Sequence, residues 1–183
     1  MILLPPSAFV SPEFRIRAAT ERWELIGAAR LRQRVFVEEQ RLFTGHDRDE
    51  IDQVALPLVA ISSFAAEPAE IVGTVRIHEP EPGLWWGSRL AVAEDHRRVG
   101  RLGAELIRLA VSAATGRGAR EFHAHVQIQN VPLFRRLHWQ VVEEVKLHGA
   151  PHAHMLASLP HYPPIPDPTI GWAARARTPG RRP

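Results

Sequence analysis

The chain has 183 residues, of which 45% are hydrophobic and 23% are charged, and its formal net charge at pH 7 is +3. These proportions are typical of one globular domain, and this length is enough to bury a full core. The absence of cysteine excludes disulfides, a thiol nucleophile and thiolate metal ligands, and it favours a cytoplasmic location. No apolar run approaches the roughly 18 residues of a membrane span, and the start Met1–Pro6 is interrupted by proline too early for a signal peptide. We therefore expect no membrane partner.

The positive charge is concentrated in the C-terminal segment. Residues 163–183 contain four arginines and one acid, which together account for the whole net charge of +3: Arg175, Arg177, Arg181, Arg182 and Asp167. The rest of the chain is therefore neutral, and a neutral body argues against nucleic acid as a partner.

The first third of the chain predicts a strand, a long helix and an acidic loop. Residues 1–13 have the composition of an irregular lead-in, and residues 14–18 alternate as a strand does. Thr20 is expected to cap a helix that runs to about residue 40. Its predicted inward stripe consists of Leu25, Ala28, Ala29, Arg32, Val35 and Phe36. An arginine on such a stripe is costly unless it is paired, and we expect Asp49 or Asp52 to pair with Arg32.

The remaining elements are recognised by their apolar periodicity and the turn residues between them. The predicted strands cover residues 58–63, 70–78, 84–92, 121–127, 139–147 and 152–159, and the predicted helices cover residues 101–116 and 130–137. Proline and arginine dominate from residue 163, which is typical of a tail or linker. The predicted organisation is a lead-in (1–13), one domain (14–162) and a tail (163–183).

A turn rich in arginine and glycine joins the strand at residues 84–92 to the following helix. Such a turn exposes the free N–H groups of the first helical turn, and these donors, with the positive end of the helix dipole, suit a phosphate group. Arg97, Arg98 and Arg101 add positive charge that matches a pyrophosphate or a 3′-phosphate. The alternative interpretation of the turn is a purely structural helix entry.

The order of elements, together with this turn, resembles the GNAT acyltransferase superfamily over residues 14–160. The resemblance implies an α/β fold with a single mixed, mostly antiparallel sheet of six or seven strands, about four flanking helices, and splayed fourth and fifth strands. Arg97–Gly100 matches the first half of the family's Arg/Gln-x-x-Gly-x-Gly/Ala loop, whereas Leu102 stands where glycine or alanine is expected. By resemblance, the residues that bind acyl-CoA are Leu90, Ala91, Val92, Arg97, Arg98, Val99, Gly100, Arg101, Leu102, Gly103 and Ala104.

The segment 130–139 resembles the family's Asn-x-x-Ala-x-x-Leu-Tyr-x-x-x-Gly-Phe motif in a shortened form. Asn130 corresponds to the asparagine that hydrogen-bonds the cofactor arm. Phe134 also belongs to the cofactor-binding residues, and it stands where many members place a tyrosine that protonates the leaving thiolate. A CoA thiolate leaves readily, so water can supply that proton instead.

The segment 31–40 resembles a GNAT subgroup with Leu-Arg-x-x-Val-Phe-x-x-Glu-Gln in its first helix. It also resembles acyl-homoserine-lactone synthases, in which an Arg-x-x-Val-Phe segment is followed by Asp-x-x-Asp, as in residues 49–52 here. The tryptophan that marks those synthases is absent. The whole chain also resembles a bacterial GNAT subfamily whose genes accompany nitrilase clusters linked to nitrogen starvation.

The histidines supply the candidate base. His123 and His125 project from one face of a strand, and His152 and His154 repeat the pattern in the last predicted strand. The resemblance places these strands side by side, so the two pairs face each other across a ladder. We expect His125, or next His123, to accept the amine proton, because imidazole titrates near neutral pH. The alternatives are histidines that are merely packed in the sheet, or a histidine metal site; without an acidic ligand pattern, we expect no metal.

The remaining site residues belong to the acceptor pocket. Glu39 is a third candidate base, and Glu38, Arg32, Phe36 and His154 are expected to contact the acceptor. Trp85 and Trp86 point to opposite faces of a strand, so one is expected in the core and one at the acyl pocket; we assign Trp85 to the pocket.

These observations predict an N-acetyltransferase that moves an acetyl or short acyl group from acetyl-CoA, or another acyl-CoA, to the amine of a small molecule. A homodimer is compatible with this prediction. The alternatives are an acyl-homoserine-lactone-type synthase that uses S-adenosylmethionine, and a degenerate GNAT domain that binds acyl-CoA as a sensor.

Overall fold

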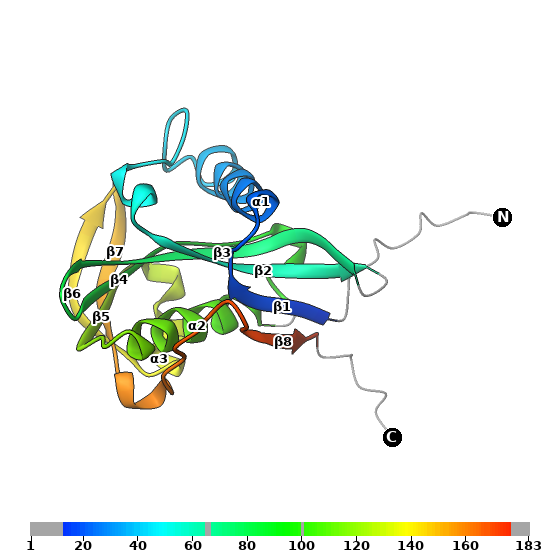
Figure 1. The fold of residues 1–183 in the computed structure, drawn as a ribbon. Helices are drawn as coiled ribbons and strands as arrows, with labels where there is room; N and C mark the ends of the chain where they lie inside the picture. Colours follow the sequence, from blue (N-terminus) through cyan, green and yellow to red (C-terminus); the bar gives the residue numbers. More distant parts are fainter. Residues whose placement is uncertain (1–12, 65–66, 100, 177–183) are drawn as a thin grey trace, which may run out of the picture.

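A computed structural model describes residues 13–64, 67–99 and 101–176 (Figure 1). The strands are β1 (Glu13–Ala18), β2 (Leu56–Phe64), β3 (Glu67–Glu81), β4 (Leu84–Val92), β5 (Glu121–Gln127), β6 (Trp139–Leu147), β7 (Ala150–Ala157) and β8 (Trp172–Arg175). The α-helices are α1 (Arg22–Arg32), α2 (Leu102–Gly116) and α3 (Val131–Arg136). A π-helix, η1 (Gln33–Glu39), extends α1, and short 3-10 turns are η2 (Glu50–Gln53), η3 (Glu94–His96), η4 (Ile128–Asn130) and η5 (Leu159–His161).

The strands form one sheet in the order β6-β7-β5-β4-β3-β2-β1-β8. The β4–β5 pair is parallel, and the other pairs found in the described residues are antiparallel. The mixed, mostly antiparallel α/β fold that the sequence predicts is therefore confirmed. The described residues contain eight strands, slightly more than the six or seven expected, and three α-helices where about four were expected.

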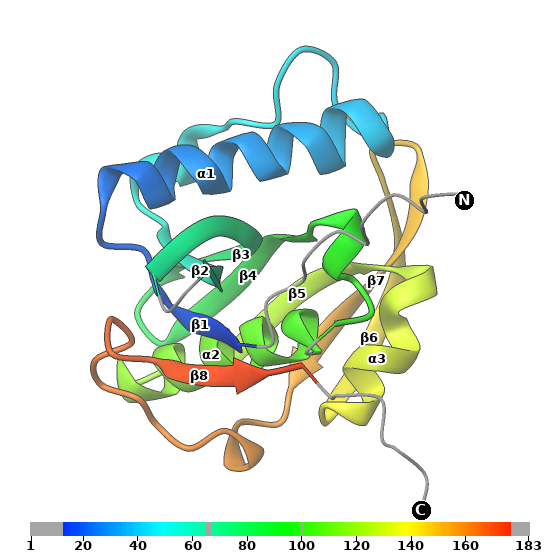
Figure 2. The same ribbon diagram turned by 90° about the vertical axis from the view of Figure 1, so that its right-hand side faces the viewer.

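Helices cover both faces of the sheet. Helix α1 lies over one face, and α2 lies on the other beside α3, as Figures 1 and 2 show. Helix α2 is apolar on its sheet-facing side, where Leu102, Leu106 and Leu109 are almost completely buried. They belong to the same hydrophobic core as Ile77, Phe122 and other side chains of the central strands. Burial of each large apolar side chain stabilises the fold by about 1.5–3 kcal/mol.

The buried face of α1 differs from the predicted stripe. Leu25 is 46% exposed, whereas the preceding Glu24 is fully buried. The Glu24 carboxylate accepts hydrogen bonds from the backbone N–H groups of Thr20 and Glu21 and forms an ion pair with Arg17. Glu21, rather than Thr20, is therefore the N-cap, and its capping box with Glu24 turns that side chain inward.

The segment after residue 163 also differs from the predicted tail, because part of it belongs to the sheet. Strand β8 pairs antiparallel with β1 and forms one edge of the sheet. The backbone N–H of Ala18 donates to Pro168 O at 2.8 Å, and Trp172 Nε1 donates to Glu105 Oε2 at 2.9 Å. The proline- and arginine-rich composition of this segment does not predict these contacts with β1 and α2. Residues 1–12 of the expected lead-in and residues 177–183 of the expected tail lie outside the described residues.

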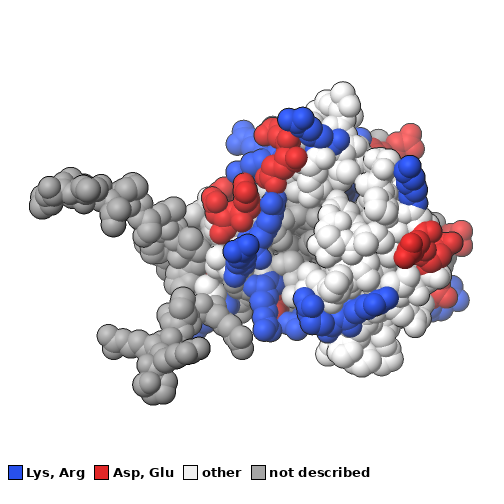
Figure 3. All heavy atoms as spheres, turned by 180° about the vertical axis from the view of Figure 1, so that it is seen from behind, with Lys and Arg blue, Asp and Glu red and all other residues white. Residues whose placement is uncertain are grey.

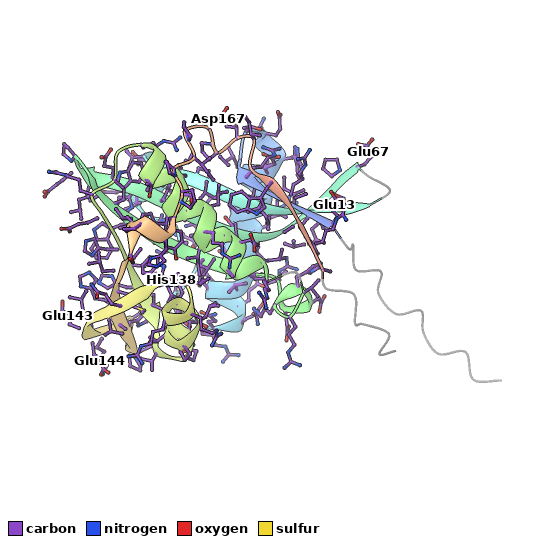
Figure 4. The ribbon with its side chains drawn as sticks, turned by 90° about the horizontal axis from the view of Figure 1, so that it is seen from below. Glu13, Glu67, His138, Glu143, Glu144 and Asp167 are labelled. Atoms are coloured by element: carbon purple, nitrogen blue, oxygen red, sulfur yellow. The ribbon has the colours of Figure 1, made fainter. Side chains whose placement is uncertain are left out.

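Strand β6 forms the other edge of the sheet and is protected by charge. Glu143 and Glu144 on this strand are exposed, and Figure 4 labels both. Charged side chains on an edge strand discourage pairing with another sheet. On the face seen in Figure 3, basic and acidic groups lie beside one another around a broad uncharged area. Among the described residues, no helix is long and apolar enough to cross a membrane.

Candidate active site

Strands β4 and β5 are paired at one end only. Their parallel register covers Leu84–Gly87 against Glu121–Ala124 and then stops, although both strands continue. Beyond Gly87, strand β4 has a bulge against β3, because the register passes from Arg76–Ser88 to Thr74–Ala91. Arg89 at this bulge has a φ of +56°, which is uncommon for a residue other than glycine. The bulge redirects β4 and accompanies the separation of the two strands.

A cavity of about 530 Å³ occupies the place where the strands separate. On the α2–α3 side, its walls include Ile107, Ala110, Phe122, Asn130 and Phe134. On the α1 side, the walls are aromatic and polar, and they include Phe36, Phe43, Asp49, Arg76, His78, Trp86, Arg89, His125 and His152. The cavity therefore has an apolar half and a half that is rich in groups able to bind or deprotonate a ligand.

The turn before α2 leaves the start of that helix uncapped. The N-cap Arg101 has a left-handed conformation (φ +54°) and its side chain makes no capping hydrogen bond. Within the described residues, no side chain caps the first turn of this 15-residue helix, and uncapped first-turn N–H groups can bind an external acceptor such as a phosphate. Arg98 and Arg101 are exposed at this turn. Gly100 lies outside the described residues.

Arg97 is already engaged within the protein. Its Nε donates to Val92 O at 3.1 Å, and its Nη2 forms an ion pair with Glu39, the last residue of η1. Next to this pair, Gln127 Nε2 donates to Gln40 Oε1 at 2.9 Å. These contacts join the end of η1 to the ends of β4 and β5. Glu39, which we expected as a candidate base, is therefore paired with an expected cofactor ligand.

Trp86 lies at the centre of the histidine cluster. Its ring stacks on His123 and His154, at centroid distances of 5.1 and 5.3 Å, and lies 4.9 Å from the ring of His125. Trp86 lines the cavity, whereas Trp85, which we expected there, is buried at 6% exposure. Successive strand residues face opposite sides of the sheet, so the two tryptophans cannot share the pocket, and it is Trp86 that faces the histidines.

The expected pairing of the His-x-His motifs across β5 and β7 is present. His125 lies opposite His154 in the antiparallel register. His123 Nδ1 is 2.9 Å from His154 Nε2, and His123 Nε2 is 2.9 Å from Glu121 Oε2. His154 Nδ1 also lies 3.5 Å from Glu143 Oε1. The imidazoles of His123 and His154 thus bond each other and two carboxylates, and neither lines the cavity.

His125 differs from these two histidines because it faces the cavity. The His125 side chain is exposed at the cavity wall, yet its partial loss of hydration there, followed by the nearby His154 and His152, holds its pKa below the ordinary value of 6.5. A lowered pKa keeps the imidazole neutral at pH 7, which is the form that accepts a proton. His78 also lines the cavity, where burial and then Arg76 lower its pKa, and its buried Nδ1 has no hydrogen-bond partner among the described residues.

An ion-pair cluster connects the end of α1 to the acidic loop and to strands β3 and β4. It consists of three arginines and three aspartates: Arg32, Arg76, Arg89, Asp47, Asp49 and Asp52. Arg32 Nε binds Asp47 Oδ2 and Arg32 Nη1 binds Asp52 Oδ1, both at 2.6 Å. Burial lowers the pKa of Arg32, but its hydrogen bonds with Asp52 and Asp47 outweigh that effect and raise it. Asp52, one of the two expected partners, therefore does pair with Arg32. The second partner is Asp47 and not Asp49, which was the other residue expected.

Asp49 instead binds the two arginines of the central strands. Arg76 makes a bidentate pair with it at 2.6 and 2.7 Å, and Arg89 Nη2 contacts Asp49 Oδ2 at 3.1 Å. The hydrogen bonds from Arg76 are the main cause that lowers the pKa of Asp49. Sequence reasoning missed Arg76 and Arg89 as site residues. Strand alternation does place Arg76 and His78 on one face, but no local signal marks the bulge that turns Arg89 toward the cavity.

Comparison with protein families matches residues 23–139 to the acetyltransferase (GNAT) family. The chain belongs to this family. Among solved structures, an acyl-CoA N-acyltransferase from Pseudomonas aeruginosa is 20% identical, with a TM-score of 0.63, and the match covers 79% of this chain and 99% of that one. Escherichia coli ElaA is 19% identical with a TM-score of 0.64, and the match covers 79% and 98% of the two chains. No curated protein matches the sequence significantly.

Structures of acyl-homoserine lactone synthases share the same fold. The CoA-dependent synthase BjaI is 19% identical to this chain, with a TM-score of 0.64, and the match covers 78% of this chain and 82% of that one. At these identities the likeness establishes the fold alone.

The expected residues of this GNAT domain fall into three groups. The cavity is lined by Phe36, Leu90, His125, Asn130 and Phe134. The turn and the start of α2, outside the cavity lining, contain Arg97, Arg98, Val99, Arg101 and Gly103. The third group consists of residues that do not line the cavity. The side chains of Ala91, Leu102, Ala104 and Trp85 are buried in the core, Val92 pairs with β3, Arg32 belongs to the ion-pair cluster, and Glu38 is exposed.

Acyl-CoA is the co-substrate of GNAT enzymes, and the residues present fit it. The uncapped start of α2 and the exposed Arg98 and Arg101 suit its phosphates. Leu90 and Asn130 line the apolar half of the cavity, where the resemblance places the pantetheine arm. Among the described residues, no group of three or more histidine, aspartate or glutamate side chains could hold a metal ion.

Proposed function

We propose that this GNAT protein is an acyl-CoA-dependent N-acyltransferase that moves an acetyl or other short acyl group to the amine of a small molecule. The observation that carries the proposal is the cavity at the split between β4 and β5. Its apolar half lies on the α2–α3 side of the sheet, and His125 lies in its polar half on the α1 side. A cytoplasmic location, membership of the nitrilase-associated bacterial subfamily and a homodimer belong to the same proposal.

In the proposed reaction, the amine nitrogen bonds to the thioester carbonyl carbon and the carbon–sulfur bond breaks. Acyl-CoA supplies the activated acyl group. His125 takes the proton from the amine, because its lowered pKa leaves it neutral at pH 7. Phe134 has no ionisable group at the position of the family's tyrosine, so the leaving thiolate takes its proton from water. The walls of the cavity orient the amine and limit access of water to the thioester.

The ion-pair cluster favours a second candidate function. Arg32, Asp49 and Asp52, which carry the resemblance to acyl-homoserine-lactone synthases, meet in this one cluster. In that candidate function, S-adenosylmethionine is the amine donor. The missing tryptophan and the neutral balance of the cluster favour the first proposal. Because Phe134 cannot donate a proton as the family's tyrosine does, a third candidate is a sensor that binds acyl-CoA without turnover.

Binding and turnover together test these functions. Isothermal titration with acetyl-CoA and longer acyl-CoAs measures binding, and thiol release over an amine panel that includes S-adenosylmethionine measures transfer. We expect binding that is lost in the double variant Arg97→Ala/Arg98→Ala but retained in Arg108→Gln, with thiol release that depends on an amine. Release only with S-adenosylmethionine would establish the synthase, and binding without release would establish a sensor. Absence of binding would overturn all three.

A further inference from the structure

Arg89 faces the polar half of the cavity because of the bulge in β4. In a regular strand Ser88 and Arg89 would point to opposite faces of the sheet. Here Ser88 Oγ accepts from Arg76 Nε at 2.9 Å, and Arg89 binds Asp47 and Asp49 on that same side. Both residues line the cavity. The positive φ of Arg89 is therefore coupled to the placement of its guanidinium in the site.

The Arg89 guanidinium is fixed but not saturated. Its Nε lies 3.1 Å from Asp47 Oδ2, its Nη2 donates to Asp47 O and Asp49 Oδ2, and its carbon Cζ lies 4.4 Å above the Phe43 ring. Within the described residues, its Nη1 donates no hydrogen bond. The side chain is only 15% exposed. A largely desolvated guanidinium with two unused N–H donors is a binding site for an oxygen acceptor.

The neighbouring carboxylate cannot serve a cationic group in the same way. Asp49 Oδ1 accepts from Arg76 and from the backbone N–H of Ile51, and its Oδ2 accepts from Arg76 and Arg89. All four of its acceptor positions are occupied. The group that the cluster presents to a ligand is therefore the donor of Arg89, and a ligand that matches it has an acceptor-rich, negatively charged end.

We propose that the acceptor amine also bears a carboxylate, which Arg89 binds through Nη1 while the amine faces His125. This inference rests on the proposed transferase function. Phe36, Phe43 and Trp86 line the same half of the cavity, so the part of the acceptor between its two polar ends is apolar. An apolar or aromatic amino acid is the substrate class with these features.

Matched pairs of acids and amides test the carboxylate site. Phenylalanine and leucine are compared with their carboxamides as acceptors in the thiol-release assay with acetyl-CoA. We expect kcat/KM for the acids to exceed that for the amides by at least about tenfold, because loss of one partner leaves buried donors unpaired. The amine of a carboxamide is less basic and so more often neutral at pH 7, which means that amine basicity alone would favour the amides.

Variants assign the preference to Arg89. In Arg89→Gln, kcat/KM for the acids should fall by about tenfold to a hundredfold, while that for the amides and the Kd for acetyl-CoA should change less than about twofold. Arg89→Lys keeps the charge without the fork-shaped guanidinium and should recover part of the preference. Arg108→Gln removes an exposed arginine of α2 and serves as the control for loss of one positive charge. Thermal unfolding shows which variants are folded.

The outcomes separate this inference from the proposed function. Equal turnover of acids and amides, or equal losses for both in Arg89→Gln, would overturn the carboxylate site. Titration with N-acetyl-phenylalanine provides a readout that needs no catalysis: binding by the wild type and loss of binding in Arg89→Gln support the site even if no amine releases thiol. Absence of thiol release with every amine overturns the transferase, and absence of binding by every carboxylate probe overturns the inference.

Discussion

The histidines on β5 and β7 have the same side chain but different surroundings. His123 and His154 are bound to each other, and Glu121 and Glu143 lie at the two ends of the pair. His125 faces the cavity, and partial loss of hydration there lowers its pKa. A general base needs access to the substrate and a neutral ring at the working pH. His125 meets both requirements, whereas the other two are positioned to hold the Trp86 ring.

Replacement of His125 by glutamine should lower kcat by about a hundredfold, which is the lower end of the contribution of a general base. The Kd for acetyl-CoA should remain unchanged, since the imidazole lies in the other half of the cavity. The acidic limb of the wild-type pH profile should lie below pH 6.5, because protonation of a base with a lowered pKa requires a lower pH. Steady-state rates of thiol release from pH 5 to 8 measure both effects. His161→Gln, on η5, is the control, and equal turnover of His125→Gln and wild type would refute the assignment.

The ion pair between Glu39 and Arg97 predicts that removal of the Glu39 charge strengthens cofactor binding, whereas loss of Arg97 weakens it. Glu39→Gln releases Arg97 from its ion pair and removes a negative charge near the expected phosphate site. We expect acetyl-CoA to bind more tightly by up to about fivefold, in line with the 0.2–1 kcal/mol of an exposed ion pair. Titration calorimetry at low ionic strength measures the change. The neighbouring Glu38→Gln makes the same change of charge outside the pair and should have a smaller effect. Weaker binding by Glu39→Gln would contradict the prediction.

At the scale of elements, the sequence predicts regular structure well and its interruptions poorly. The bounds predicted for β4, β5 and β6 agree with the structure, because alternating strands between turn residues leave a local pattern. The π-helix η1 and the bulge at Arg89 leave no such pattern, since η1 keeps the helical periodicity of α1 with a different hydrogen-bond spacing and the bulge depends on pairing with β3. These interruptions position much of the site. Phe36 and Glu39 lie on the first, and Arg89 lies on the second.

The same distinction applies to the ion-pair cluster. The sequence marks Arg32 as a buried charge in need of a partner, and it marks the acidic loop as the source. It cannot specify which arginine pairs with which aspartate, because Arg76 and Arg89 reach the loop only when β3 and β4 are folded beside it. Chain separation of 27 residues between Asp49 and Arg76 leaves no spacing rule to apply.

At the scale of the whole molecule, β8 ties the C-terminal segment to the first strand and to α2. Gly171, which precedes β8, has a φ of +53°, and a Cβ atom there would lie 1.8 Å from Ile16 O. Gly171→Ala should therefore reduce the free energy of unfolding by at least about 2 kcal/mol, since the backbone of β1 would have to move. Gly118→Ala is a matched control, because Gly118 also has a positive φ but an added Cβ meets no atom within 4 Å. It should cost only about 1 kcal/mol. Urea unfolding compares the two, and equal losses would show that β8 does not constrain Gly171.

The ion-pair cluster joins the loop after η1 to β3 and β4, so its protonation should affect the stability of the whole domain. Arg76 holds the pKa of Asp49 below its ordinary value of 3.8, and hydrogen bonds with Arg32 and Arg76 outweigh burial to lower that of Asp52 further. In the unfolded chain both carboxylates take up protons near pH 3.8, so the cluster contributes its full stability above that pH.

Below pH 3.8 the unfolded state binds more protons than the folded state, and stability therefore falls as the pH decreases toward the lowered pKa values. Asp52→Asn should lower the free energy of unfolding at pH 7 by about 1–3 kcal/mol, because charge-assisted hydrogen bonds are lost, and it should flatten the acid dependence between pH 4 and 2.5. The exposed Asp95→Asn is the control for removal of one carboxylate. Urea unfolding at a series of pH values gives both slopes. If Asp52→Asn and Asp95→Asn had the same slope as the wild type, acid stability would have to arise outside the cluster.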